Sequence, residues 1–553
     1  MNKNTVFLVI LLAFVFGPNP TSAHENDSNQ LSEQTHFWNA GQRKSFVRKK
    51  VSHRARGEYG SWRNPYVSLA DAEADQADWD VLYVLPSPTH LGPLDGGILL
   101  LDGQNLVGLG PNPFYAGWFP WRAMISNSTS ARHDGDAIVL GEGSEVRGIH
   151  ITDPYRSAIN ADLAGSAKMS HVLITGHNQN EEVFADGSAV GLSSFGAIHS
   201  QFGPGGRIDI ANVAIKNGKG HGILVYVAAA QKDVNVRRIR ISGIDTSSFE
   251  NAATAYGLVL NTSEGAMMKA SVSKSLIQDI NNNRRNRGIE IVGNDTSTAR
   301  LTVVDSIFKN IPSTGVLEDG AIVPIAFGAS VGETVLIAEN NLFENCAQGI
   351  EARDIFSPDS VLKMQIKKNI FRNIDSASAI NLQNFATRGS HVIVVENNYG
   401  SGIFGSAFDI TNIASTIVES TVTVRNNRFE DFGTGVSLAN VGSDANPGRI
   451  EKMDLLVEGN EFIDGMVGIS SFENGPSSNN AANLDFGGGG LGSIGLNRFV
   501  GNAMDASIVS FGTPLHVDAK LNWWGSASGP TSATPIGAGS ISTDPFLTSD
   551  PRP

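Results

Sequence analysis

Short stretches of alternating apolar and polar residues recur along most of the chain, and similar polar segments follow them. The clearest segments are 339–345, 368–373, 426–431 and 459–464, each with a large apolar residue close behind an asparagine. Most are followed by a small residue and an aliphatic one. Alternation with a period of two is typical of strands with one buried face. The pattern therefore predicts a repeating unit of three short strands separated by tight turns.

One large apolar residue per unit marks the repeat, at a mean spacing of about 32 residues. The residue two positions later is always Asp, Asn, Gly or Ser, the types that tolerate left-handed backbone angles or cap turns. We therefore expect a turn at that position in every unit. The apolar series is Ile151, Ile174, Ile215, Ile241, Ile277, Phe308, Phe343, Phe371, Tyr399, Phe429, Phe462, Phe499 and Trp524.

Two positions before the apolar residue, the later units carry asparagine. Side chains two apart on a strand point to the same side, so both residues are expected inside. Identical buried amides stacked about 4.8 Å apart can satisfy one another by hydrogen bonds. These columns predict an all-β fold, a right-handed parallel β-helix (a solenoid) of about 13 coils. The asparagine column is Asn341, Asn369, Asn397, Asn427, Asn460, Asn497 and Asn522.

The ends of such a rod need covering, because unpaired strand edges promote aggregation. Residues 67–78 have the pattern of a short amphipathic helix, which predicts an N-terminal helical cap. We expect the cap and first strands at 57–110, the parallel β-helix at 111–525, and a C-terminal wrapping tail at 526–553. Residues 24–56 are expected to form a basic and polar linker, with contact to an acidic polymer as the less favoured interpretation.

Residues 1–23 have the character of a secretory signal peptide. Lys3 precedes an apolar run at 6–16 that is too short to span a bilayer, and small residues lead to Ala23. We expect a secreted or periplasmic protein without a transmembrane segment, and the bacterial cell surface stays open as its final location.

Composition limits the classes of ligand and cofactor that the protein is expected to bind. The 553-residue chain has a formal charge of -14, which argues against nucleic acid, and it contains one cysteine, which excludes a disulfide framework or cysteine-rich metal site. Histidines 150, 171, 177, 199 and 221 share no column, so no metal site is predicted. We expect no cofactor, with calcium left open but supported by no motif.

The Asn-x-Phe-x-Asn/Asp coils, the segment 522–530 and the lead-in at 57–70 resemble the right-handed parallel β-helix proteins of the pectate-lyase-like superfamily. The resemblance covers about residues 57–545 and implies, by analogy, a polysaccharide partner. Gly220-His221-Gly222 is similar to a triplet of polygalacturonases, which share this fold, and so makes His221 a catalytic candidate. The paired aspartates of those enzymes are missing, because the chain has no Asp-Asp dipeptide, and a Gly-rich turn is the favoured explanation of the triplet.

Asp153 and Arg156 are the other catalytic candidates. A carboxylate and a cation on one turn suit a uronate lyase or epimerase, in which a base removes a proton beside a carboxylate that the cation neutralises. The Arg-x-Pro-x-x-Arg pattern of pectate lyases is absent, and Asp153 also belongs to the turn column.

Aromatic residues and exposed positions suggest where a ligand would lie. Tyr115, Trp118 and Trp121 are candidates for a sugar-stacking surface, against the alternative that they pack a cap or loop. Long insertions, including the Gly-rich 486–492, are expected to wall a groove. Four aliphatic residues that precede the core residue are expected to be covered by a loop or partner: Leu276, Ile307, Leu342 and Ile370.

Two functions remain from the sequence. The first is an exported β-helix protein that binds an extended polysaccharide along a lateral groove, with processing by a polysaccharide lyase or glycoside hydrolase left open. The second is a non-enzymatic scaffold or adhesin at the cell envelope. An outward cluster of ionisable side chains with perturbed ionisation would favour the first.

Overall fold

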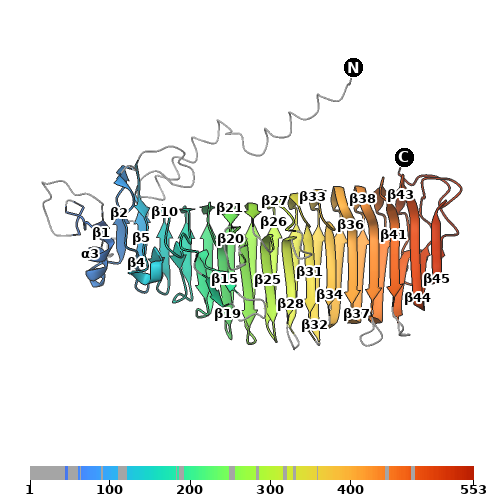
Figure 1. Cartoon of the computed structure of the whole chain (residues 1–553), viewed down its shortest axis with the longest axis horizontal. Coiled ribbons are helices and arrows are strands. Elements are labelled where there is room, and N and C mark those ends of the chain that lie inside the picture. Colours follow the sequence, from blue (N-terminus) through green and yellow to red (C-terminus); the bar gives the residue numbers. More distant parts are fainter. Residues whose placement is uncertain are drawn as a thin grey trace, which may run out of the picture.

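The computed structural model describes residues 44–47, 60–62, 64–88, 91–109 and 121–552, apart from gaps at 182, 186–191, 248–253, 255, 282–284, 315–319, 328–331, 358, 386, 443–447 and 475–479. The strands lie side by side along one rod, from β1 (Lys44–Val47) to β45 (Ala533–Ser542) (Figure 1). Strands of successive coils pair in parallel, which confirms the predicted parallel β-helix. The predicted signal peptide lies outside the described residues.

Each coil contributes strands to three faces, which we call faces A, B and C. The long strands β36 (Tyr399–Ile413) and β38 (Arg428–Val441) turn the corner from face C to face A, and β44 (Met504–Ala519) and β45 turn from A to B. The other strands of face A are β4 (Ile98–Leu99), β8 (Ile138–Val139), β11 (Ile159–Asn160), β16 (Gly196–Gln201), β19 (His221–Ala228), β22 (Leu258–Ser263), β25 (Arg287–Asn294), β28 (Gly320–Phe327), β31 (Ile350–Ile355), β34 (Ile380–Phe385) and β41 (Val467–Asn474). Face B contains β1, β2 (Val81–Val84), β5 (Asn105–Gly108), β9 (Ser144–Arg147), β12 (Ala167–Ser170), β17 (Gly206–Ala211), β20 (Gln231–Arg237), β23 (Met267–Ser273), β26 (Thr298–Val304), β29 (Glu333–Glu339), β32 (Ser360–Lys367), β35 (Arg388–Glu396), β37 (Thr416–Arg425), β39 (Arg449–Glu458) and β42 (Asn480–Gly487). Face C contains β7 (Met124–Ile125), β10 (His150–Thr152), β13 (Leu173–Thr175), β18 (Ala214–Lys216), β21 (Arg240–Asp245), β24 (Leu276–Asn281), β27 (Ile307–Ile311), β30 (Leu342–Cys346), β33 (Ile370–Ile374), β40 (Glu461–Ile463) and β43 (Arg498–Val500).

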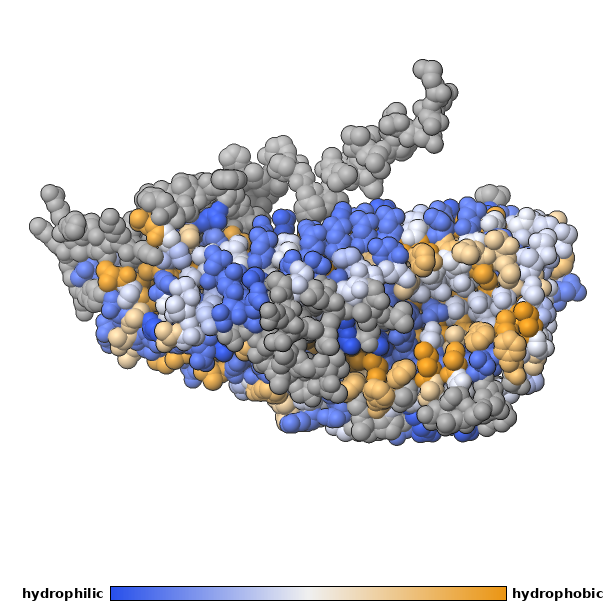
Figure 2. Space-filling view, viewed as in Figure 1, coloured by the Kyte–Doolittle hydropathy of each residue, from blue (hydrophilic) through white to orange (hydrophobic). Residues whose placement is uncertain are grey.

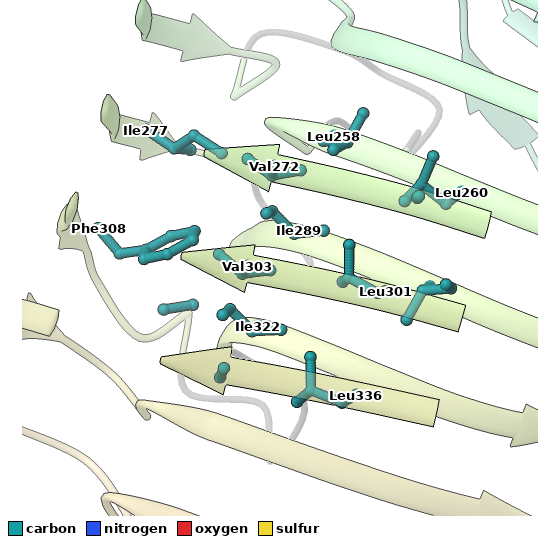
Figure 3. Packing of buried hydrophobic residues seen from close by; sticks show 14 of the residues in the cluster. Leu258, Leu260, Val272, Ile277, Ile289, Leu301, Val303, Phe308, Ile322 and Leu336 are labelled. Atoms are coloured by element: carbon teal, nitrogen blue, oxygen red, sulfur yellow. The ribbon is translucent and has the colours of Figure 1, made fainter. Parts of the chain in front are cut away.

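The pairing register places like residues above one another in the core. Phe343 pairs with Phe371, and their rings lie nearly parallel with centroids 4.8 Å apart. Figure 3 shows the same stacking nearer the N-terminus, where Ile277 lies next to Phe308 and Val272 next to Val303. These files of apolar side chains merge into one continuous buried core. The predicted internal file of large apolar residues on face C is therefore confirmed.

A ladder of asparagine side chains runs beside the phenylalanine file. Asn341 Nδ2 donates to Asn369 Oδ1 at 3.0 Å, and the same Oδ1 accepts from the backbone N–H of Asn341 at 3.0 Å. The second amide hydrogen reaches a backbone carbonyl, as from Asn341 to Val303 at 2.9 Å. The ladder replaces water for amides that are completely enclosed. Its members are Asn341, Asn369, Asn398, Asn427, Asn460, Asn497 and Asn522.

In one coil the prediction is wrong by one residue. Tyr399 pairs with the outward Ile370, and Gly400 takes the core position between Phe371 and Phe429. The ladder residue is accordingly Asn398, whereas Asn397 is exposed. A Cβ on Gly400 would lie 2.4 Å from Cδ1 of Phe429, so the neighbouring ring leaves room only for glycine.

The residue two positions past the core residue of face C adopts the predicted left-handed backbone. Two positions past the core residue φ is positive, as at Asp279 (55°), Asn345 (54°) and Asp464 (56°). In the shifted coil Gly402 takes this position, with φ 65°. Side chains that hydrogen-bond locally or have no Cβ make such angles accessible.

The rod ends carry less helix than expected. Helix α3 (Leu69–Ala74) buries Leu69 and Ala72 in the core, but it is only 6 residues long, and its role as a cap stays a prediction. Strand β1 lies within the range expected as a linker, and β45 within the range expected as a tail. In the described part of the chain no helix is long and apolar enough to cross a bilayer.

The outward aliphatic row on face C is half-buried. Leu276, Ile307, Leu342 and Ile370 pair with one another on successive coils, so each side chain partly covers its neighbours. The row therefore loses part of its exposed area by stacking along the rod.

Replacing Asn398 with alanine is expected to lower the free energy of unfolding by about 3 kcal/mol, because buried donors and acceptors lose their partners. Asn369 Nδ2 would lose its acceptor, and the carbonyl of Ile366 its donor. Urea denaturation followed by circular dichroism measures the loss. Asn397→Gly is the matched control, since glycine tolerates its φ of 58°. An equal loss in both variants would contradict the role of the ladder.

Candidate functional site

Ionisable side chains gather on the outer surface of face A over a run of neighbouring coils. The register aligns Asn160 with His199 and Gly196 with His221, and the same outward positions continue through Arg287 in β25. Equivalent positions on successive coils form a band parallel to the rod axis. We call it the polar band, and its members are Asp136, Arg156, Asp162, His177, His199, His221, Tyr256, Arg287, Glu290, Glu351 and Arg353.

Arg156 anchors the N-terminal part of the band. Its Nε and Nη2 donate to the two oxygens of Asp136 at 2.8 and 2.6 Å, and its guanidinium lies 4.7 Å from the ring centre of Phe195. Asp136 is fully buried and also accepts from the backbone of Ser157 and from Asn160. Burial alone would lower the pKa of Arg156, but the bond to Asp136 outweighs it and the pKa is raised. Arg156 is therefore a fixed cation with part of its surface still exposed.

His199 and Asp162 form the next group. His199 Nε2 lies 3.8 Å from Asp162 Oδ1, with the histidine fully buried and a third of the aspartate side chain exposed. The backbone N–H of Gln201 donates to the same oxygen at 2.5 Å. Burial raises the pKa of Asp162, although His199 opposes this rise, and burial lowers the pKa of His199. Asp162 is thus a carboxyl group with favoured protonation and with access to solvent.

His221 and His177 are buried as neutral imidazoles. His221 Nδ1 accepts from the backbone N–H of Tyr256 at 2.9 Å, which leaves the ring proton on Nε2. Burial lowers the pKa of His221 to about 3 and that of His177 to about 4. A Cβ on Gly218 would lie 1.7 Å from His177 Cε1, so the sequence must be glycine where this ring packs.

Tyr256 and Arg287 continue the band toward the C-terminus. The guanidinium carbon of Arg287 lies 5.3 Å from the ring centre of Tyr256, and Arg287 Nη1 donates to Glu290. Burial raises the pKa of Tyr256 to about 12. Further along, Arg353 Nε lies 3.9 Å from Oε1 of the buried Glu351. The cations of the band are thus matched by carboxylates that keep them in place.

Two of the three catalytic candidates lie in this band, and Asp153 does not join them. Asp153 sits in a turn with φ 46° and accepts from Thr152 Oγ1 at 2.8 Å. Its Oδ1 would lie 2.1 Å from a Cβ on Gly176, so the carboxylate packs against the turn of the next coil. Arg156 is instead held by Asp136, a residue that the sequence does not single out.

The Gly-His-Gly triplet has a packing explanation as well. A Cβ on Gly220 would lie 2.1 Å from the carbonyl oxygen of Phe195, and one on Gly222 would lie 2.5 Å from that of Gly257. Both glycines therefore allow backbones of adjacent coils to approach closely around His221.

The aromatic candidates are only partly described. Tyr115 and Trp118 lie outside the described residues. The backbone of Trp121 belongs to β6 (Trp121–Arg122), which pairs antiparallel with β3 (Ser87–Pro88).

Two insertions meet beside the polar band. The antiparallel hairpin of β14 (Val183–Ala185) and β15 (Leu192–Ser194) leads directly into β16. Ser194 Oγ donates to the carbonyl of Thr254, in the insertion before β22, at 2.7 Å.

The Gly-rich segment at 486–492 wraps around one buried carboxylate. Asp485 accepts hydrogen bonds from the backbone N–H groups of Gly487, Gly489, Leu491 and Ser493.

Metal-ligating groups do not converge in the part of the chain that the structure describes, where no three His, Cys, Asp or Glu side chains could hold an ion together. Cys346 lies in the core, and burial raises the pKa of its thiol to about 12. A thiol with this environment is inert as a nucleophile.

Sequence reasoning misses most of the band because face A has no regular spacing. Asp136, Tyr256 and Arg287 occupy the same outward position as His221, two residues before the first aliphatic core residue of the strand, but insertions of different lengths separate them along the chain. A signal was available in the sequence. The face A strands open with a small residue followed by an aliphatic one, such as Gly222-Ile223 and Gly288-Ile289, and aligning the coils on this pair brings the outward positions into one column.

Acidification is expected to destabilise the protein through its buried histidines. Since the folded-state pKa of His221 (about 3) lies below the ordinary value of 6.5, the unfolded state binds more protons between these values, and stability falls as pH drops through this window. At about pH 4.5 one such histidine costs about 3 kcal/mol. Thermal melting of the wild type and His221→Asn at neutral and acidic pH measures the effect, because asparagine keeps the acceptor for Tyr256 N–H but cannot be charged.

The variant should lose less stability on acidification than the wild type. His516→Asn is the control, as His516 is half exposed. A wild type and His221→Asn variant with the same pH dependence would contradict the assignment.

Comparison with known proteins finds distant similarity to solved structures alone. No family model matches the sequence, and no curated protein matches it. Among solved structures, the chain is similar to DFA-IIIase from Arthrobacter chlorophenolicus A6 in complex with GF2, with 13% identity over 76% of this chain and 94% of that one, and a TM-score of 0.25. A cysteine-to-alanine mutant of the same enzyme in complex with DFA-III matches with 11% identity over 76% and 95%, also at a TM-score of 0.25. Similarity at this level carries no argument about the chemistry of the present chain.

Proposed function

We propose that the polar band binds an extended polysaccharide lying along the rod. The observation that carries the proposal is the band itself, which follows one face from Asp136, before β8, to Arg353 in β31, over roughly 30 Å. Ionisable side chains recur on most of these coils, with β28 contributing none, so a polymer that lies along the rod would meet side chains of the band on several coils. A globular ligand would use only a few of these positions.

The chemistry of the band suits sugar hydroxyl groups. Carboxylates accept hydrogen bonds, guanidinium groups donate them, and a neutral imidazole does both. A sugar hydroxyl group therefore finds a partner whether it donates or accepts. Arg156 and Asp162 keep part of their side chains exposed, and Phe195 adds a partly exposed ring beside Arg156. These three residues therefore form the accessible centre of the proposed site.

Processing of the bound polymer would centre on Asp162. Burial raises the pKa of the Asp162 carboxyl group, which favours a role in proton transfer, and His199 lies beside it. Asp162 is accordingly the residue assigned to acid–base chemistry in this proposal.

A non-enzymatic scaffold is the second candidate, and burial favours it. His177, His221, Tyr256 and Glu351 are almost completely enclosed. Buried groups of this kind would stabilise the coils and leave only the rim of the band for a ligand. In both versions we propose an exported protein, on the signal-like sequence of residues 1–23.

A panel of neutral, uronate-containing and amino-sugar polysaccharides tests the proposal. For each polymer, retention of the protein, new reducing ends and ultraviolet-absorbing unsaturated products are measured. The wild type should be retained by at least one polymer. Asp162→Asn should reduce product formation by about a hundredfold while retention persists. Asp209→Asn, on the outer surface of face B with a similarly exposed carboxylate, is the matched control and should change neither.

The outcomes separate the two candidates. Retention without products would exclude processing and support the scaffold. Failure of every polymer to be retained by the wild type would overturn the proposed function.

A further inference from the structure

A row of three aromatic rings, two of them exposed and one partly buried, lies at the corner between faces A and B. Phe327 ends β28, Phe356 follows β31 and Phe385 ends β34, so three successive coils each present one ring. The centroids are 6.3 Å apart for Phe327 and Phe356 and 5.7 Å apart for Phe356 and Phe385. Phe356 and Phe385 are 54% and 43% exposed. We call these three residues the aromatic ridge.

The backbone at Phe356 is unusual for so large a residue. Its φ is 52°, in the left-handed region, where a bulky side chain is strained. On other coils the residue that directly follows the face A strand has the same backbone but is smaller or polar, namely Ala229, Glu264, Asp295 and Ala414. Because the Phe356 ring is exposed, the core gains little from it, and the strain is unexplained by packing.

The same combination occurs nearer the N-terminus. Phe202, directly after β16, has φ 53° and is 60% exposed, and its ring lies 4.5 Å from that of Tyr226 in β19. Two exposed phenylalanines thus occupy left-handed positions where the chain leaves face A. Aromatic rings at this corner are a repeated feature.

Polar side chains border the ridge on face A. Arg353, Gln383 and Thr411 occupy one register position on β31, β34 and β36, and all three are partly exposed. In the adjacent row burial raises the pKa of Asp409, which pairs in register with Asn381. The ridge therefore runs beside a row of mainly uncharged donors and acceptors.

Figure 2 shows apolar patches that interrupt the hydrophilic surface along the lower edge of the C-terminal half of the rod. Exposed apolar patches on a monomer often mark binding sites.

We propose that the aromatic ridge is a stacking surface for successive sugar rings of the polysaccharide, and this inference rests on the proposed function. A sugar ring has an apolar C–H face, which fits a phenylalanine ring, and a rim of hydroxyl groups, which fits Gln383 and Thr411. One ring per coil matches a ligand built from repeating units. A protein partner would instead favour a continuous apolar patch with a dehydrated centre.

Affinity electrophoresis with the polysaccharide that the wild type retains tests the ridge. Phe385→Ala and Phe356→Asn should each weaken retention by roughly tenfold, as expected for truncation of an aromatic anchor. Phe404→Ala is the matched control, because Phe404 is 74% exposed but lies in β36 between the parts of that strand that belong to faces C and A. It should leave retention unchanged.

Thermal melting separates binding from stability. Asparagine tolerates the left-handed backbone, so Phe356→Asn should keep or raise the melting temperature while it weakens retention. Equal retention of both ridge variants and the wild type would overturn the ridge while leaving the proposed function intact. A wild-type dimer in sedimentation that Phe385→Ala dissociates would instead make the ridge an interface between copies and overturn the proposal.

Discussion

From Asn341 to Asn497, each buried amide of the asparagine ladder donates one hydrogen bond to the asparagine of the next coil. Asn369 Nδ2 reaches Asn398 Oδ1, Asn398 reaches Asn427, and no water competes inside the core. A slip of one residue would move the amide to the outside and leave its partners unsatisfied. From Asn341 to Asn522 the ladder therefore enforces the register that stacks the phenylalanine file beside it, and strand pairing between successive coils aligns the other faces.

The strand register also determines which outward-facing side chains become neighbours. Once face C is aligned, the outward positions of face A on neighbouring coils come into line, although insertions of different lengths separate them in the chain. Arg156 thus meets Asp136, and Tyr256 meets both His221 and Arg287. The same alignment sets Phe356 beside Phe327 and Phe385. The polar band and the aromatic ridge are consequences of one stacking rule, applied to two positions of the coil.

Charge within the band is balanced locally, and this bears on what it can bind. Arg156 and Arg287 are each tied to a carboxylate, so neither presents an unpaired cation to an acidic polymer. The histidines are held neutral by burial. The accessible surface is thereby suited to hydrogen bonds with hydroxyl groups more than to capture of a strongly charged chain. The net charge of -14 points the same way.

The sequence alone determined the repeat, the inward asparagine and phenylalanine columns and the left-handed turn after face C, because these depend on side-chain spacing within one coil. It misplaced Tyr399 and Asn397, since only contact with Phe429 reveals that Gly400 occupies the core position. The neighbourhood of His221 and the ridge at Phe356 were decided by tertiary structure. Their partners come from other coils, across insertions whose length carries no information about register, so only the hydrogen-bonded pairing of whole strands brings them together.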